Sequence, residues 1–488
     1  MNILLDTNIL IPLEDTSRIL DSSFAELRKL SAEQHHCLYI HPIQLKDIDR
    51  DKNIERRNIV KSRLAQYQQI ENPPILSDLE REGLGLRQTN ENDSVDNNVL
   101  FALYRGAVHI LVTNDDGIHK KATKIGIQDK VYRLEQFLQF LQRSISSDFT
   151  FEYTGVRERF LYEINKNQCF FDSLRKSYNG FNAWFQKCAE EKRKCWCIED
   201  ENGNIVAICI YKIEQNEKLT DDGDITIGSI LKLCTFKVDT QARGKKLGER
   251  LMYIAFNYCV TNNIDWVYLH TFGEEQQTLV GLCEEYGFSF LGKYKQDDVY
   301  IKPMKINSNN ESTLDSLIKY YPFFNDDISV RKFIIPIQPK YHEDLFPDYG
   351  NMKGSLFEKE QSLYSCQGNT IKKAYLCHSK IKSIKRGDII LFYRSKDRKS
   401  IQCMGIVEDA FFSENVDEVF SRIAKRTVYS YADLKKILET KTLVILFRFI
   451  ALDNEIPFKR IKDFGINGNI QTIRQISDNQ YLLIKNEN

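Results

Sequence analysis

Four aspartates in the first third of the chain stand where their carboxylates could be brought together. Asp6 follows the apolar run 2–5, and Asp115 follows the apolar run 108–113. Asp47 and Asp96 lie in segments whose apolar spacing predicts helices. Strands that alternate with helices predict an α/β sheet, and such sheets place their sites beyond the carboxyl ends of the strands. The sequence therefore predicts one acidic site at that sheet edge.

Carboxylates that share a site repel one another unless a cation neutralises them, and all-oxygen ligands suit Mg²⁺ or Mn²⁺. Such an ion activates water and stabilises a phosphodiester under attack. Metal-dependent phosphodiester cleavage is therefore the predicted chemistry, with catalytic and metal-binding residues Asp6, Asp47, Asp96 and Asp115. The alternative is that these acids are helix N-caps and solvated turn residues, where aspartate is common.

The same residues resemble a known family. Asp6-Thr7-Asn8 after an N-terminal strand is similar to the opening of the PIN-domain ribonucleases, and residues 41–47 resemble their second motif, with Asp47 in place of the more frequent Glu. Asp96 and residues 112–115 resemble the third and fourth motifs. The resemblance covers residues 1–142 and implies a parallel α/β/α sheet whose acids bind Mg²⁺ or Mn²⁺ and cut RNA. It also implies supporting roles for Asn8 and Thr113, while the adjacent acids Asp93 and Asp116 could replace a named ligand.

A second motif lies in the middle of the chain. A predicted strand over 230–238 leads through a basic turn containing glycine into a helix that begins near Glu249. The unpaired amides and positive dipole end of a helix N-terminus bind anions, and Arg243 and Lys245 add charge. The alternative is an ordinary strand–helix connection with a solvated basic loop.

This stretch resembles motif A of the GNAT acetyltransferases, whose turn binds the pyrophosphate of coenzyme A. Residues 279–288 are similar to the helix and Gly-Phe motif of that fold, and the coverage is about 150–305. Two residues depart from the pattern: Lys246 replaces the middle glycine, and Cys283 stands where many members have a tyrosine acid, with Tyr286 at a different offset. The resemblance implies a mixed α/β sheet that binds acetyl-CoA through Val238, Arg243, Gly244, Lys245, Lys246, Leu247 and Gly248.

The last third of the chain predicts a compact, barrel-like β-domain with amphipathic helices near 416–423 and 431–438. Residues 385–393 resemble the Gly-Asp strand of the PUA-like superfamily, in particular EVE and ASCH domains, which bind RNA or modified bases. Tyr393 could stack on a base, and basic residues could contact phosphates: Lys385, Arg386, Arg394, Lys396 and Arg398. The alternative is a solvated basic hairpin with Tyr393 in the core.

Composition limits the classes of protein. The chain has 488 residues, 68 basic and 68 acidic, so a polycationic protein is excluded, but the charge is uneven. Residues 1–145 carry 19 basic and 21 acidic side chains, a net charge of −2. The residues from Asn325 onward carry 27 basic and 21 acidic side chains (net +6), and the remaining residues carry 22 basic and 26 acidic ones (net −4). No apolar stretch is long enough to cross a membrane, and twelve scattered cysteines without a signal peptide favour a reducing, cytoplasmic setting. The spacing of Cys195 and Cys197 is a poor zinc site.

We therefore predict a multidomain α/β protein with a PIN-like nuclease domain (1–145), a GNAT-like domain (150–305) and a PUA-like domain (325–488), separated by polar breaks near 143–150 and 307–313. The predicted function combines RNA cleavage with acetyl transfer in a toxin-like or antiphage role, with tRNA as one candidate partner. One alternative is a protein or small-molecule N-acetyltransferase with a degenerate PIN scaffold. Another is a non-catalytic RNA-binding adaptor. The acetyl acceptor and the oligomeric state stay open.

Overall fold

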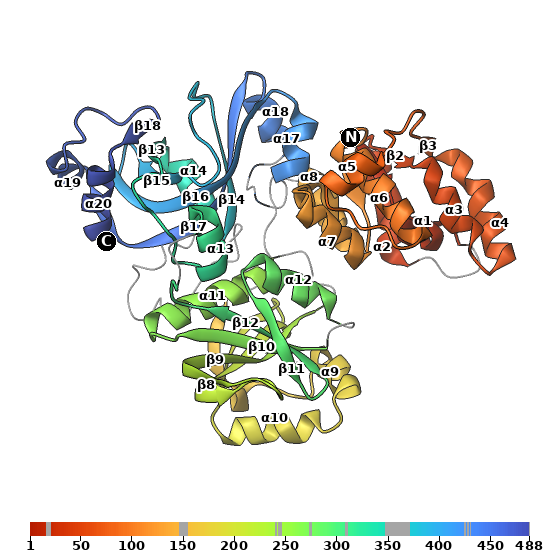
Figure 1. The fold of residues 1–488 in the computed structure, drawn as a ribbon, viewed down its shortest axis with the longest axis horizontal. Coiled ribbons are helices and arrows are strands. Elements are labelled where there is room, and N and C mark those ends of the chain that lie inside the picture. The colour runs from red at the N-terminus through yellow and green to blue at the C-terminus, as the bar shows by residue number, and fades with distance from the viewer. Residues whose placement is uncertain are drawn as a thin grey trace. The chain divides into compact units, whose positions relative to one another are not determined.

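The fold comes from a computed structural model (Figure 1) that describes residues 1–15, 21–145, 155–239, 242, 246–272, 276–307, 311–346, 371–423, 426, 429 and 431–487. These residues form two compact units. The first contains 1–149 together with 413–425 and 429–440, and the second contains the rest of the chain. The first unit is therefore discontinuous in sequence.

The first unit is built on a parallel five-stranded sheet in the order β3 (Gln68–Gln69), β2 (Cys37–Ile40), β1 (Asn2–Leu5), β4 (Ile110–Val112), β5 (Val131–Tyr132). Its central strands are apolar because helices cover both faces of a parallel sheet: Ile3, Leu4 and Leu5 have no exposed surface. The predicted parallel α/β sheet is confirmed. Its helices are α1 (Thr7–Glu14), α2 (Ser22–Glu33), α3 (Leu45–Asp49), α4 (Ile54–Arg63), α5 (Asp78–Gly83), α6 (Glu91–Tyr104), α7 (Asp116–Lys124) and α8 (Leu134–Ile145).

Two further helices of this unit, α17 (Val416–Ile423) and α18 (Tyr431–Ile437), come from the last third of the chain. The ring of Phe420 packs on that of Phe140 with centroids 4.5 Å apart, and the Tyr132 hydroxyl donates to the carbonyl of Ser421 at 3.2 Å. The sequence predicts both helices but gives no sign that their apolar faces belong to the N-terminal sheet.

The middle of the chain forms a seven-stranded mixed sheet within the second unit. The order is β11 (Ser289–Tyr294), β12 (Asp297–Pro303), β10 (Trp266–Thr271), β9 (Ile225–Val238), β8 (Ile205–Lys218), β7 (Lys194–Glu199), β6 (Arg157–Phe160). Only β9 and β10 pair in parallel among the described pairings. α9 (Asp172–Ser177) and α10 (Phe181–Glu190) pack on one face, α11 (Leu247–Thr261) packs on the other, and α12 (Gln277–Glu285) follows β10 (Figure 1).

The last third of the chain forms a six-stranded mixed sheet in the order β14 (Lys372–Cys377), β17 (Thr442–Pro457), β16 (Ser400–Ser413), β15 (Ile389–Arg394), β13 (Lys332–Ile337), β18 (Arg474–Ile476). This part is rich in strands, as the sequence predicts for a β-domain. The described pairings run from β14 to β18 without closing, so the barrel stays a prediction. The helices α13 (Thr313–Tyr320), α14 (Pro339–Leu345), α19 (Phe458–Asp463) and α20 (Asp478–Asn486) complete this part.

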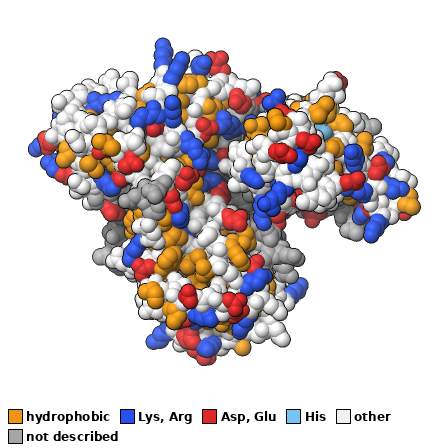
Figure 2. Space-filling model, viewed as in Figure 1, with side chains coloured by type: hydrophobic (Ala, Val, Ile, Leu, Met, Phe, Trp, Pro, Cys, Tyr) orange, Lys and Arg blue, Asp and Glu red, His pale blue; other side chains and the backbone are white. Residues whose placement is uncertain are grey.

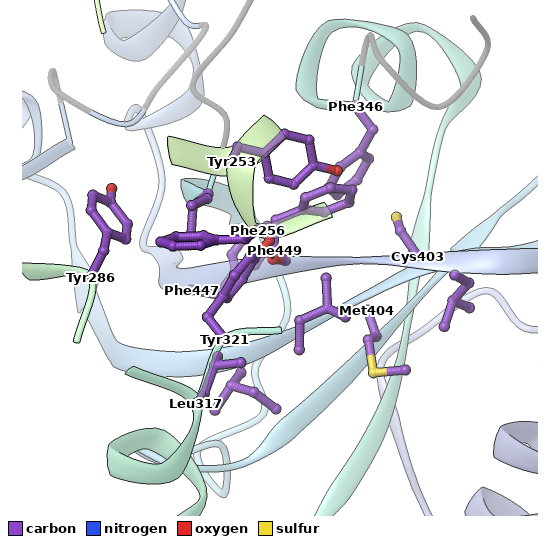
Figure 3. Close-up of a cluster of buried hydrophobic side chains, with 14 of the residues drawn as sticks. Tyr253, Phe256, Tyr286, Leu317, Tyr321, Phe346, Cys403, Met404, Phe447 and Phe449 are labelled. Carbon is purple, nitrogen blue, oxygen red and sulfur yellow. Dashed lines mark hydrogen bonds between the residues drawn. The ribbon is translucent and has the colours of Figure 1, made fainter. Parts of the chain in front are cut away.

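The two sheets of the second unit share one hydrophobic core (Figure 3). Phe256 of α11 meets Tyr321 with ring centroids 5.9 Å apart, and the Tyr321 hydroxyl donates to the carbonyl of Phe449 on β17 at 2.8 Å. Tyr286, Phe346 and further aromatic side chains continue the cluster. Because burying so many aromatic side chains is strongly stabilising, the two sheets form one compact body.

Candidate functional site

The first candidate site lies where β9 ends and α11 begins. Val238 is the last residue of β9, and Lys246 is the N-cap of α11 in the left-handed conformation (φ 62°). Glycine favours this conformation, which explains why many sequences of this pattern have glycine at the position of Lys246. The predicted ligands Arg243, Gly244 and Lys245 lie outside the described residues.

Gly248 lets α11 approach the sheet closely. A Cβ atom at Gly248 would lie 3.1 Å from Leu282 Cδ2, and Phe236 and Val238 of β9 would lie within 3.8 Å. Leu247 is buried beside it. Lys246, the N-cap residue, makes no side-chain capping hydrogen bond, and no other capping side chain is found among the described residues. The first-turn amides of α11 therefore keep the unsatisfied donors that bind anions in many proteins.

Glu249, in the first turn of α11, joins this helix to the last sheet. Its side chain is 3% exposed, and Oε1 accepts from the backbone amides of Ile371 and Lys372 at 2.9 and 3.3 Å. Lys246 Nζ donates to Oε2 at 3.1 Å. Burial alone would raise the pKa of Glu249, but the charge of Lys246 and the two amides outweigh it and lower this pKa to about 2.

An ion-pair network continues from this contact through the interior. Lys372 pairs with Glu285 of α12, and Arg448 Nη1 donates to the carbonyl of Glu285 at 3.2 Å. Arg448 Nε also donates to Glu408 Oε1 at 2.7 Å, and Arg426 pairs with the same carboxylate. Since a buried charge without a partner is costly, this network holds the two sheets in one arrangement.

The second feature of this domain is a separation between its two parallel strands. β9 and β10 pair over Ile230–Leu233 and Trp266–Leu269, and within the described chain no pairing joins them beyond these residues. Both strands nevertheless continue, to Val238 and Thr271. Among the described residues, the backbone groups of β9 and β10 beyond this point are therefore not used in pairing these two strands, and a ligand bound there could meet them.

His270 is the first residue after this separation on β10. Its Nδ1 lies 3.4 Å from Asp297 Oδ2, and its ring is close to those of Tyr268 and Tyr294, with centroid distances of 5.6 and 5.4 Å. Burial and the charge of Lys232 lower the pKa of His270 and outweigh the effect of Asp297. The imidazole is therefore neutral at neutral pH and able to accept a proton.

A group of polar side chains lies on the face of the sheet that carries His270. Tyr268 donates its hydroxyl to Glu214 Oε2 at 2.6 Å, Lys212 pairs with the same carboxylate, and Lys232 Nζ lies 5.2 Å from the Tyr268 ring. Sequence analysis missed this group. Its signal was present, because Lys212 and Glu214, and again Tyr268 and His270, are two residues apart, a spacing that puts side chains on one face of a strand.

Neither alternative acid in this domain is accessible. Cys283 is fully buried, which raises the pKa of its thiol. Tyr286 is also fully buried, its pKa is raised well above the usual value by burial, and the Arg448 guanidinium lies 5.4 Å from its ring centroid. Cys283 and Tyr286, at which the sequence departs from the family pattern, are therefore core residues.

In the first unit, the structure brings the predicted aspartates to one sheet edge. Asp6 follows β1 and caps α1, and Asp115 follows β4 and caps α7, so the N-cap interpretation is correct for both. Asp6 Oδ2 accepts from Thr113 Oγ1 at 2.6 Å and from Asn8 Nδ2 at 2.8 Å, as expected for supporting groups. Asp47 Oδ2 accepts from Thr7 Oγ1 at 3.0 Å.

The four predicted carboxylates interact electrostatically. Burial raises the pKa of Asp6 to about 6 despite hydrogen bonds from Thr113 and Thr7, and the charges of Asp96 and Asp115 raise it further. Burial also raises the pKa of Asp96, against the effect of Lys121 and together with the charges of Asp115 and Asp47.

Cations of the chain itself occupy the edges of this acidic group. Lys121 Nζ lies 3.0 Å from Asp93 and 3.2 Å from Asp96, and Arg50 pairs with Asp47. The other spare acid, Asp116, pairs with Arg133. Among the described residues, no three acidic, histidine or cysteine side chains have the arrangement of a metal site. The Mg²⁺ or Mn²⁺ site therefore stays a prediction.

The predicted base-stacking residue of the last sheet is not on the surface. Tyr393 is 4% exposed and packs against Phe458, as the core interpretation holds. Arg394 is engaged by Asp397 and Glu343. Exposed basic side chains remain at 385, 386, 396 and 398. Figure 2 shows basic and acidic side chains interspersed over the visible face.

Comparison with known proteins identifies the middle domain. Residues 159–288 match the acetyltransferase (GNAT) family, so the chain contains a GNAT domain, and this family uses acetyl-CoA. No curated protein matches the chain. Similar solved structures include an ASCH protein from Zymomonas mobilis (13% identity, 32% of this chain and 94% of that one, TM-score 0.24). A GNAT-family acetyltransferase from Staphylococcus aureus is also similar (17% identity, 31% of this chain and 100% of that one, TM-score 0.23). So is the NatC complex bound to Gag peptide and CoA (16% identity, 31% of this chain and 99% of that one, TM-score 0.23).

Two further findings bear on the sequence predictions. Within the described part of the chain, no helix is long and apolar enough to span a membrane. The described cysteines, Cys195 and Cys197 among them, are free thiols.

The Glu249 contact gives a pH-dependent prediction. Its folded-state pKa is lowered, so its stabilisation is complete above pH 4.5 and is lost as the pH falls toward 2. Glu249→Gln should therefore lower the free energy of unfolding by about 3 kcal/mol near pH 6, and the difference should shrink as the pH falls from 5 to 2. All three tryptophans lie in the GNAT domain, so urea unfolding followed by tryptophan fluorescence measures the second unit.

Glu284→Gln is the matched control. It makes the same glutamate-to-glutamine change, but Glu284 is an exposed residue, on the helix that also carries Glu285. A difference between Glu249→Gln and the unsubstituted protein that stays constant over this pH range would contradict the assigned role of Glu249.

Proposed function

We propose that the protein transfers an acetyl group from acetyl-CoA to an amine, and that His270 is the base that accepts the amine proton. The observation that carries this proposal is the separation of β9 and β10 next to the uncapped N-terminus of α11. Free backbone groups on the strands suit the amide-containing arm of coenzyme A, and the helix amides suit its phosphates. The GNAT match over residues 159–288 supports acetyl-CoA as the donor.

His270 is the proposed base that receives the proton of the acceptor amine. A protonated amine must lose a proton before its lone pair attacks the thioester carbonyl, and the coenzyme A thiolate leaves as the acyl–sulfur bond breaks. His270 is neutral and adjacent to Asp297, which stabilises the imidazolium once the proton has moved. The acceptor class, whether RNA, an aminoacyl group on RNA or a protein, is identified by incubating the protein with labelled acetyl-CoA and separated RNA, protein and small-molecule fractions. Label in none of them would refute acetyl transfer.

Replacement of the proposed base gives the kinetic test. With the labelled acceptor, His270→Gln should lower kcat by about 10²- to 10⁴-fold and leave the KM for acetyl-CoA nearly unchanged, because the side chain acts on the proton. The pKa of His270 is lowered, so the rate of the unsubstituted protein should be flat through neutral pH and fall only below about 6.5, as the imidazole becomes protonated. Asp297→Asn should give a smaller loss.

Asp298→Asn is the control, since Asp298 is the next residue on β12 and pairs with Lys293. Unchanged kcat in His270→Gln would contradict the assignment of the base.

A second candidate activity, favoured by the interacting carboxylates of the first unit, is metal-dependent cleavage of RNA. The all-oxygen donor set fits Mg²⁺ or Mn²⁺, and the mutual repulsion that raises the pKa of Asp6 is the kind that a cation relieves. The metal, when bound, would activate water. RNA as the substrate rests on the resemblance to PIN-domain ribonucleases, and exposed basic residues 385, 386, 396 and 398 offer phosphate contacts.

Asp6→Asn and Asp115→Asn test this activity. Each removes one charge, yet asparagine remains a good N-cap, so the helices that these residues begin should persist. Mn²⁺-dependent cleavage of total RNA should fall by at least about 10²-fold in each variant, with circular dichroism unchanged. Asp116→Asn, adjacent but paired with Arg133, should retain activity. Full cleavage by the Asp6→Asn, Asp115→Asn double variant would remove this site as the nuclease centre.

A further inference from the structure

Arg250, one turn into α11, is a buried cation without a partner. The residue is 2% exposed, and none of its three side-chain nitrogens, Nε, Nη1 and Nη2, makes a hydrogen bond with a described residue. No other arginine in the described part of the chain has all three nitrogens buried and unpaired. A guanidinium is always charged in proteins and carries five N–H donors, so burying it without acceptors is expensive.

The nearest acid of the helix is not available to Arg250. Glu249 accepts from the amides of Ile371 and Lys372 and from Lys246. Arg448, which is as deeply buried, does have a carboxylate partner in Glu408. The interior of this unit therefore supplies a carboxylate to its other buried arginines, Arg448 and Arg426, and the described residues supply no acceptor to Arg250.

The direction of helical side chains places the Arg250 charge near the first turn. The Cα–Cβ bonds of a helix tilt toward its N-terminus, so a long side chain extends over the turn that precedes it. For Arg250 that turn begins at Lys246, whose side chain does not cap the helix. The uncapped amides and the residue that carries the buried guanidinium thus belong to the same end of one 15-residue helix.

We infer that Arg250 binds phosphoryl oxygens of the nucleotide end of coenzyme A and so completes an anion site with the first-turn amides of α11. A phosphoryl group presents the acceptors that a guanidinium fork matches in a bidentate contact. Coenzyme A carries two such groups, the pyrophosphate and the 3′-phosphate. The inference rests on the proposed acetyl-CoA chemistry and adds a residue that none of the sequence motifs assigned.

The test measures binding of coenzyme A and 3′-dephospho-coenzyme A to the full chain by isothermal titration calorimetry, for the unsubstituted protein, Arg250→Gln and Arg250→Lys. Loss of a charged, bidentate contact should weaken coenzyme A binding about 10- to 100-fold in Arg250→Gln, and Arg250→Lys should recover part of it. Arg159→Gln, which removes an arginine paired with Glu199 in the same domain, is the control and should bind normally.

The two ligands identify the phosphate. If Arg250 contacts the 3′-phosphate, Arg250→Gln should weaken the binding of coenzyme A but not that of 3′-dephospho-coenzyme A. The variant should then bind the two ligands with equal affinity. If Arg250 contacts the pyrophosphate, the affinities of Arg250→Gln for both ligands should fall by the same factor.

Thermal unfolding followed by tryptophan fluorescence gives an independent readout. Because Arg250 is unpaired without ligand, Arg250→Gln should unfold at the same or a higher temperature than the unsubstituted protein when free, and at a lower temperature when both are saturated with coenzyme A. Equal coenzyme A affinity in Arg250→Gln and the unsubstituted protein would overturn the role of Arg250 alone. Absence of coenzyme A binding by the unsubstituted protein would overturn the proposed acetyl transfer together with this inference.

Discussion

The second unit depends on one buried carboxylate. Glu249 stands in the first turn of the helix that faces the proposed acetyl-CoA site, and it accepts from two backbone amides at the start of β14. An acid in a first turn normally satisfies the helix's own N-terminus. Here the carboxylate instead accepts hydrogen bonds from backbone amides of another sheet, and the Lys246 side chain does not cap the first-turn amides. The contact that joins two sheets thereby also keeps the helix end available for an anion.

The sequence predicts most of the elements because their signals are local. The Asn-Gly turn at 202–203 separates β7 from β8, and apolar runs mark β1 and β4. Asp6 and Asp115 are predicted at one sheet edge because parallel strands end there together, and Asn8 and Thr113 do contact Asp6. Long-range partners leave no such signal. Nothing local shows that Phe420 packs on Phe140, that Tyr393 is buried, or that Lys121 and Arg50 lie among the predicted acids.

Two helices from the last third of the chain belong to the first unit. α17 and α18 are connected through β16 and β17 to the sheet that Glu249 contacts, yet they pack with the N-terminal sheet. The chain therefore crosses from one compact unit to the other and back.

The most direct measurement is hydrogen–deuterium exchange of the full chain with and without acetyl-CoA. If the donor binds where β9 and β10 separate, exchange should slow in residues 230–238, 246–251 and 266–272, while the acidic edge at residues 3–8 and 110–118 should be unaffected. Slower exchange confined to the first unit, or no change anywhere at saturating acetyl-CoA, would contradict the account.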